Sequence, residues 1–246
     1  MKKLFNSDIK LISSLKKRKY RENLSLFIVE GVKPVRELYL SGIKPEKIVV
    51  DISKKLEISY LEGYDEIYST EKFNKISTLE NSEGILSVYK TPSFKDKVSK
   101  DSKKILLLHD ISDPGNMGTL IRTAVWFGVE SIILSGNCTD PFSPKSVRSC
   151  MGQIFCINFI KIDNCKEYIK SLDDFKIVST YISEKSTYLK KDEEKTIVMI
   201  GSESNGLPEI YKDLKRENFL IEKIGKTESL NASIAAGIIM YEIFGK

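Results

Sequence analysis

The stretch DPGNMGTLIRTAVWFG, residues 113–128, has the pattern of an amphipathic helix with glycines at its start. If the helix begins at Asn116, its apolar residues follow the i, i+3, i+4 spacing of a helix that packs on a core. Asn116 is a common capping residue, and a cap alone would explain it. Arg122 lies off the apolar face, one turn after Gly118, and helical side chains lean towards the helix N-terminus. A surface charge would also explain Arg122, but the stretch favours a site for an anion or a hydroxyl at the open end of the helix.

Around this helix, the second half of the chain alternates short apolar runs with helical stretches. The runs are apolar throughout rather than at every second residue, which is typical of parallel strands buried on both faces. They are residues 104–111, 131–136, 157–162, 176–182, 196–202 and 218–224. We therefore expect an α/β domain with a mainly parallel sheet.

The first half of the chain predicts a smaller α/β domain. Its clearest expected elements are a helix around residues 9–15, strands at 26–31 and 47–51, and a helix at 33–42. Residues 91–104 are polar and charged, as in a segment between domains. We place the domains at residues 1–95 and 105–246, with a linker at 96–104.

Composition indicates an ordinary soluble globular protein, with 41% hydrophobic and 30% charged residues among 246. We expect neither a secretory signal nor a membrane span, and therefore a cytoplasmic protein. The four cysteines form no C-x-x-C pair, which favours free buried thiols and no metal. His109 is the only histidine and follows an apolar run, so we interpret it as a structural residue at a strand end.

The net charge of +5 is concentrated at the N-terminus. Residues 1–20 contain seven Lys or Arg and one Asp, and subtracting that +6 from +5 leaves −1 for the remaining chain. Such a segment is either a solvated helix face or a phosphate-binding patch, and composition alone does not separate the two.

Two further polar clusters follow apolar runs. GSESNGLP, residues 201–208, has the pattern of a strand-to-helix turn, with Pro208 expected as the first helical residue. TESLNASIAAGIIMYEIF, residues 227–244, places serines and Asn231 at the start of an apolar helix. IGKT, residues 224–227, is no phosphate loop, because Leu220 stands where that motif needs glycine. Three such turns at the carboxyl ends of strands indicate a ligand site.

In order and spacing, these clusters resemble the three motifs of the SpoU family of RNA 2′-O-methyltransferases, in the SPOUT superfamily. The motifs are DPGNMGTLIRTAVWFG, MIGSESNGL and IEKIGKTESLNASIAAG, and SPKSVRSCMGQIF at 143–155 resembles the segment between the first two. The resemblance covers residues 104–246. YRENLSLFIVEGVKPVREL, residues 20–38, resembles more loosely the ribosomal-protein-like RNA-binding domain often attached to this family.

The resemblance implies a deep trefoil knot, a homodimer, S-adenosyl-L-methionine as cofactor, and no metal. It implies a catalytic group of Asn116, Arg122, Glu203, Ser229 and Asn231. Cofactor-binding positions are Thr180, Gly201, Ile221 and Leu230. RNA contacts are expected at Lys16, Lys17, Arg18, Lys19 and Arg148. A guanidinium is very hard to deprotonate, so we expect Arg122 to orient the ribose 2′-hydroxyl rather than act as a base.

This sequence departs from the family pattern at a few positions. The family usually has Ile-Pro-Met where residues 221–223 read Ile-Glu-Lys, serine at Cys150 and glycine at Ser204. None of these departures removes an expected catalytic group. The two-domain layout resembles members that modify rRNA, so large-subunit rRNA is favoured over tRNA. A tRNA ribose methyltransferase and a non-catalytic RNA-binding or ribosome-assembly protein are the alternatives.

Overall fold

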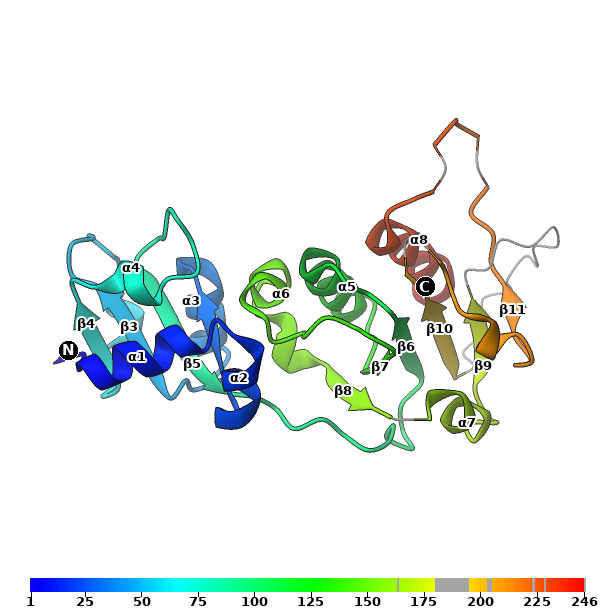
Figure 1. The fold of residues 1–246 in the computed structure, drawn as a ribbon, viewed down its shortest axis with the longest axis horizontal. Helices are drawn as coiled ribbons and strands as arrows, with labels where there is room; N and C mark the ends of the chain where they lie inside the picture. The colour runs from blue at the N-terminus through cyan, green and yellow to red at the C-terminus, as the bar shows by residue number, and fades with distance from the viewer. Residues whose placement is uncertain (163, 180–194, 203–204, 223, 228, 246) are drawn as a thin grey trace. The chain divides into compact units, whose positions relative to one another are not determined.

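The computed structural model spans residues 1–246 and describes all of them except 163, 180–194, 203–204, 223, 228 and 246 (Figure 1). The chain forms two compact units. Unit 1 contains Met1–Pro92 and Asp140–Ile154, and unit 2 contains Ser93–Thr139 and Phe155–Lys246. Unit 1 is therefore assembled from two segments that are far apart in the sequence.

Unit 1 is built on a mixed sheet in the order β1-β4-β3-β5-β2. Its strands are β1 (Lys2–Lys3), β2 (Leu26–Glu30), β3 (Lys47–Asp51), β4 (Ile67–Thr70) and β5 (Ile85–Lys90). Its helices are α1 (Asn6–Ser14), α2 (Arg18–Leu24), α3 (Val32–Leu40), α4 (Phe73–Ile76) and α6 (Pro144–Ser149), with a 3-10 turn at Ser59–Leu61. β1, β4 and β3 pair in parallel, whereas β5 runs antiparallel between β3 and β2.

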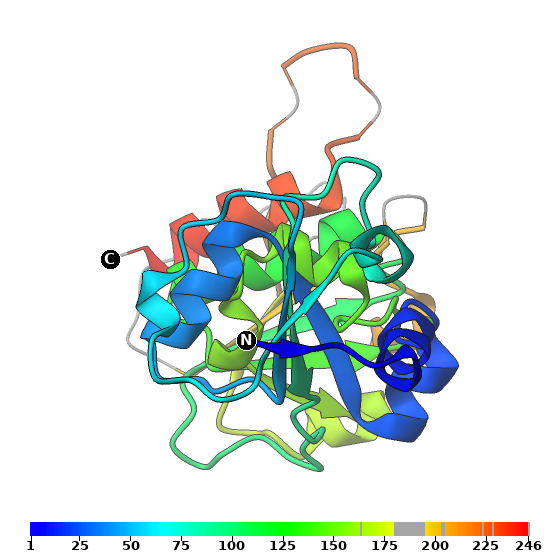
Figure 2. The same ribbon diagram turned by 90° about the vertical axis from the view of Figure 1, so that its left-hand side faces the viewer.

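The sheet of unit 1 is covered on both faces. Ile12 of α1 and Phe73 of α4 pack with Val49 and Leu86, which share one face of the sheet. Figure 2 shows α1 on one side of the sheet and α3 on the other. Successive side chains along β3 and β5 point to opposite faces of the sheet, so these strands contribute to a small core on each face.

Unit 2 is built on a sheet in the order β11-β9-β10-β6-β7-β8, and all of its pairings are parallel. The strands are β6 (Lys104–His109), β7 (Ser131–Ser135), β8 (Asn158–Lys161), β9 (Lys176–Ser179), β10 (Thr196–Ile200) and β11 (Glu217–Asn218). The helices are α5 (Pro114–Trp126), α7 (Cys165–Lys170) and α8 (Ala232–Phe244), and Gln153–Cys156 and Glu209–Tyr211 form 3-10 turns. α5 and α8 pack together on one side of the sheet, opposite α7 (Figure 1). The predicted mainly parallel sheet is confirmed.

One predicted strand is wrong. Of residues 218–224, only Asn218 is in β11, and the described residues that follow it up to α8 belong to no helix or strand. The apolar run is interrupted at Glu222, and the side chains of residues 218–221 are only half-buried. This leaves an irregular loop at the carboxyl edge of the sheet.

The segment predicted as a linker is attached to unit 2. The Lys95 N–H donates to the Phe159 carbonyl at 2.8 Å, and the Val98 N–H donates to the Tyr168 hydroxyl at 2.6 Å. The Val98 side chain is buried in the core of unit 2. Within the described residues, no helix is both long and apolar enough to cross a membrane.

Candidate active site at the carboxyl edge of the parallel sheet

α5 begins earlier than its sequence pattern suggested. Asp113 is the N-cap, since its carboxylate accepts from the Asn116 backbone N–H at 2.9 Å, and Pro114 is the first helical residue. The prediction that Asn116 starts and caps the helix is therefore wrong. Aspartate followed by proline is a strong start signal, because proline has no N–H left to satisfy and its φ is already helical. As a result, the Asn116 side chain is not the cap.

The first and third motifs meet through two asparagines. Asn231 caps α8, where its carbonyl oxygen accepts from the Ser233 N–H at 2.9 Å and from the Ser233 hydroxyl at 2.6 Å. Its amide nitrogen donates to the Asn116 carbonyl oxygen at 3.1 Å. This bond joins the first turn of α5 to the start of α8, across 115 positions of sequence. The sequence predicted that the first and third motifs share one site, and this hydrogen bond shows that they are in contact.

The packing of α5 against α8 holds this pair in place. Met117, Leu120, Ile121 and Ala124 are buried, as the amphipathic pattern predicts. In α8, Gly237 faces α5, and a Cβ there would lie in ordinary contact, 3.8 Å, with a methyl group of Thr123. The two helix starts are thus fixed relative to each other within unit 2.

Arg122 extends from this rigid pair of helices with an exposed side chain. Within the described residues, no hydrogen bond or ion pair engages its guanidinium. Ser229 and Leu230, which precede Asn231, are exposed as well. A cation that the described part of the chain leaves without a partner, on the same helix as Asn116, is suited to contact a polar or anionic ligand group.

The second motif forms a tight turn after β10. Ser202 and Gly206 exchange two backbone hydrogen bonds, at 3.2 and 2.9 Å, so the chain folds back on itself. A Cβ at Gly201 would lie 2.1 Å from the carbonyl carbon of Gly206 and 2.4 Å from the Leu207 nitrogen. Glycine at position 201 is therefore a requirement of the turn. Two predicted site residues, Thr180 and Glu203, lie outside the described residues.

The loop between β11 and α8 has the features of a ligand cradle. Among the described residues, no backbone hydrogen bond engages positions 220–222, 224–227 or 229–230. Ile221 is half-buried, and Leu230 exposes 44% of its surface. Free backbone donors and acceptors next to exposed apolar side chains fit a ligand that combines a flat base with a ribose. The donor set thus suits the cofactor expected at Gly201, Ile221 and Leu230.

A buried polar network lies beneath this edge. His109, at the end of β6, places Nδ1 3.1 Å from the Ser135 hydroxyl, which lies 2.8 Å from the Tyr211 hydroxyl. On its other side, Nε2 lies 3.3 Å from a carboxylate oxygen of Asp110. Burial lowers the pKa of His109, and Asp110 opposes that shift in part. Because Tyr211 follows the 201–207 turn, the network ties that turn to β6 and β7.

Of the residues in this network, the sequence singled out only His109. The structural role predicted for this histidine agrees with its geometry, but Ser135 and Tyr211 carried no signal in the sequence. Burial raises the pKa of Tyr211 well above its ordinary value.

The expected RNA-contacting residues all belong to unit 1. Lys16 and Lys17 are exposed between α1 and α2, Lys19 is exposed in the first turn of α2, and Arg18 pairs with Glu22 at 2.7 Å. Arg148 lies in α6, whose segment is part of the same unit. The predicted basic residues, which are far apart in the sequence, thus belong to one unit, and their contact with RNA stays a prediction.

All four cysteines are free, and Cys150 and Cys165 are buried. Burial raises the pKa of Cys150 to about 11, so that thiol is inert near neutral pH. The prediction of burial is wrong for Cys156, which is exposed. Among the described residues, no group of three His, Cys, Asp or Glu side chains could hold a metal ion.

Comparison with known proteins agrees with this architecture. Residues 103–241 match the model of the SpoU rRNA Methylase family, and residues 6–87 match an MRM3-like substrate binding domain. The chain is 29% identical over 247 aligned residues to 23S rRNA (guanosine(2553)-2′-O)-methyltransferase RlmP of Bacillus subtilis (strain 168). That alignment covers 98% of this chain and 97% of the relative.

Solved structures show the same fold over nearly the whole chain. An AdoMet-bound rRNA methyltransferase from Sinorhizobium meliloti superposes with a TM-score of 0.83 at 26% identity, covering 98% of this chain and 95% of that one. The SpoU methyltransferase AviRb from Streptomyces viridochromogenes shares the fold, with a TM-score of 0.81 at 24% identity and 97% coverage of both chains. With its three motifs on one edge of a parallel sheet and a family match over more than half its length, the chain belongs to the SpoU rRNA methylase family.

Proposed function

We propose that this SpoU-family methyltransferase transfers a methyl group from S-adenosylmethionine to a ribose 2′-hydroxyl in large-subunit rRNA. The observation that carries this proposal is the 3.1 Å bond between Asn231 and Asn116, which joins the third motif to the first, whose helix α5 also bears the exposed Arg122. The Bacillus subtilis relative is named for ribose methylation of 23S rRNA, and the Sinorhizobium meliloti structure contains AdoMet. These relatives support the substrate and the cofactor.

The residues at the sheet edge divide the work between holding and orienting. When bound, S-adenosylmethionine supplies an electrophilic methyl group on a sulfonium. The backbone around Gly201, Ile221 and Leu230 would hold it, with Thr180 nearby. The tight turn that requires glycine at 201 gives this cradle a fixed shape.

Arg122 is the group that we assign to the acceptor. Its guanidinium keeps its proton at neutral pH, so it donates hydrogen bonds to the 2′-oxygen or an adjacent phosphate and favours alkoxide character there. Asn116 and Asn231 fix the ribose or the guanidinium, and Ser229 completes the polar surroundings. Glu203 is assigned to the same group by the family resemblance alone. The chain thereby contributes position and electrostatics and leaves the methyl chemistry to the cofactor.

Replacing Arg122 with alanine tests this assignment. We expect methyl transfer to unmodified rRNA to fall by about 10²–10³-fold, as when an oxyanion-stabilising donor is removed. Cofactor affinity measured by calorimetry should stay within about twofold, because Arg122 is assigned to the acceptor. Lys215→Ala, an exposed cation elsewhere in unit 2, is the matched control. Near-wild-type transfer by Arg122→Ala would exclude the proposed role.

The RNA itself is identified by mapping ribose methylation in cells with and without the protein. Loss of one 2′-O-methyl group in large-subunit rRNA is the expected result. Loss in tRNA would instead support the tRNA methyltransferase, which the names of several relatives leave open. No change in either RNA, together with no cofactor binding, would favour a non-catalytic RNA-binding protein.

We also infer that the protein works as a homodimer. Ile234, Ile238 and Tyr241 follow the i, i+4, i+7 spacing on α8 and expose 54%, 38% and 54% of their surfaces. An apolar helix face of this kind is suited to a second copy of the chain, as the family resemblance implies. Light scattering should give twice the monomer mass for the wild type and the monomer mass for Ile234→Asp. The trefoil knot remains an expectation from the family.

A further inference from the structure

The segment Asp140–Ile154 packs in unit 1, although unit-2 residues precede and follow it in the sequence. Phe142 places its ring 5.2 Å from that of Phe27 in β2, and Val147 and Cys150 are buried. α6 lies within this segment and packs against β2. The segment thus completes the core of unit 1.

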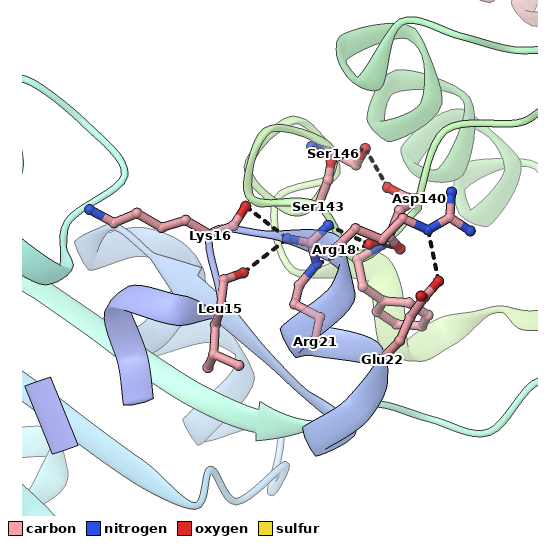
Figure 3. Close-up of polar contacts among 9 residues, drawn as sticks. Leu15, Lys16, Arg18, Arg21, Glu22, Asp140, Ser143 and Ser146 are labelled. Carbon is pink, nitrogen blue, oxygen red and sulfur yellow. Dashed lines mark hydrogen bonds and ion pairs between the residues drawn. The ribbon is translucent and has the colours of Figure 1, made fainter. Parts of the chain in front are cut away.

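A buried ion pair anchors the start of the segment (Figure 3). Arg21 of α2 is only 5% exposed, and its Nε and Nη2 donate to one carboxylate oxygen of Asp140 at 2.9 and 2.6 Å. Its Nη1 donates to the carbonyls of Leu15 and Lys16 at 2.9 and 3.0 Å. Asp140 also accepts the Ser146 hydroxyl at its carbonyl, at 3.2 Å. One guanidinium therefore fixes both the α1–α2 turn and the approach to α6.

Basic side chains from the two anchored pieces meet along residues 75–78. The Lys16 ammonium donates to the Lys75 carbonyl at 3.0 Å. Arg148 of α6 donates to the Thr78 hydroxyl at 3.3 Å. The two contacted residues, Lys75 and Thr78, are three positions apart, so their Cα atoms lie within about 11 Å of each other. Lys17 completes the approach to this row as an exposed cation next to Lys16.

Glu30, the acidic side chain that bonds to Thr78, is internally satisfied. Glu30 is 5% exposed and accepts hydrogen bonds from Ser77, Thr78 and Ser82. Its carboxylate therefore points into the interior of unit 1. The Thr78 hydroxyl donates to this carboxylate and accepts a hydrogen bond from Arg148. The exposed side of the row presents ammonium and guanidinium groups.

We propose that docking of Asp140–Ile154 through the Arg21–Asp140 pair completes a phosphate-binding surface for the backbone of RNA. The surface consists of Lys16, Lys17, Lys19, Lys75 and Arg148. Cations in a row bind successive phosphates without reading sequence, and they position an RNA on the protein. That the partner is RNA rests on the proposed function. The surface depends on the Arg21–Asp140 pair, which is itself buried and is not assigned a contact with RNA.

RNA affinity measured against salt concentration tests the surface. With an unmodified 23S rRNA transcript as probe, Arg148→Ala and Lys75→Ala should each reduce the slope of log K against log[KCl] by about 0.7–0.9. Lys44→Ala is the matched control. Lys44 precedes β3 and Lys75 follows β4, and because these two strands are parallel, the two lysines lie at opposite ends of the sheet. Unchanged slopes in both Arg148→Ala and Lys75→Ala would overturn the surface.

The dependence on docking is tested by a double-mutant cycle. Asp140→Asn should reproduce the slope loss of Arg148→Ala, and the double variant should lose no more than either single variant. Hydrogen exchange in α6 should rise in Asp140→Asn and stay unchanged in Arg148→Ala. If Asp140→Asn unfolds unit 1, Asp140→Glu takes its place in the same cycle.

Fully additive losses would overturn the docking role. Failure of the wild type to methylate any RNA would refute the proposed function while leaving these binding slopes intact. Wild-type slopes in every variant of an active methyltransferase would refute the surface alone.

Discussion

Replacing Gly201 with alanine is expected to disrupt the turn after β10 and, with it, cofactor binding. The added Cβ would lie 2.1 Å from the carbonyl carbon of Gly206, 2.2 Å from its oxygen and 2.4 Å from the Leu207 nitrogen. Ordinary contacts of a Cβ begin near 3.4 Å, so the backbone at residues 206–207 would have to retreat by about 1 Å. These are backbone atoms, which cannot rotate away as a flexible side chain would.

The size of the effect follows from what that movement breaks. The two hydrogen bonds between Ser202 and Gly206 would be lost, at about 1 kcal/mol each. Leu207, which is 4% exposed, would leave part of its place in the core, at a cost of about 1–2 kcal/mol. We therefore expect the free energy of unfolding to fall by about 3–4 kcal/mol, a large share of the stability of an ordinary domain.

Urea unfolding and calorimetric titration with S-adenosylmethionine measure the two consequences. Gly237→Ala is the matched control, since a Cβ there would meet only an ordinary contact, 3.8 Å from a methyl group of Thr123, and the position lies in α8 rather than in the cofactor cradle. The control should bind the cofactor like the wild type and be at least as stable. If Gly201→Ala does the same, the turn is not required in the form described, and its assignment to the cofactor cradle fails with it.

Three further outcomes follow from the same contacts. Because burial holds the pKa of His109 below its ordinary value, the unfolded chain binds this proton first as the pH falls. Unfolding by urea should therefore become easier below about pH 6.5, and His109→Gln should lose this part of the pH dependence. Asp113→Ala removes the cap of α5 and should lower the unfolding free energy by about 1 kcal/mol in the same assay. Asn231→Ala should cost about 1–2 kcal/mol, whereas Asn231→Ser should keep the cap of α8 and still lose methyl transfer, since serine is too short to reach Asn116.

The parallel sheet of unit 2 could be predicted because its strands are buried on both faces. Runs such as 104–109 and 196–200 leave no polar face, and that pattern is local. The buried stripe of α5 could also be read from spacing. Its start was misplaced because Asp113 and Asn116 are both capping residues, three positions apart. Pro114 decided between them, and its signal was present in the sequence.

Other features depend on partners that no local pattern names. Residues 219–221 are apolar enough for a strand, but a strand needs a neighbour. Among the described residues, the pairing with β9 continues only at the Phe219 N–H, which donates to the Ser179 carbonyl. The contact of Ser135 with Tyr211 joins positions 76 residues apart. Such a bond appears only once the sheet has brought the two elements together.

The basic N-terminal segment shows how charge counting can mislead about a surface. Arg21 stands at its end and would extend it by one more cation, yet its guanidinium is buried against a carboxylate 119 positions away. The docked segment Asp140–Ile154 contributes Arg148 to the same unit, although Arg148 is far from the N-terminal lysines in the sequence. Arg21 uses four of its five N–H donors in internal hydrogen bonds and is 5% exposed, so it is poorly placed to bind a phosphate. Its effect on RNA must therefore act through the cations that it holds in place, which is why the double variant should lose no more than either single one.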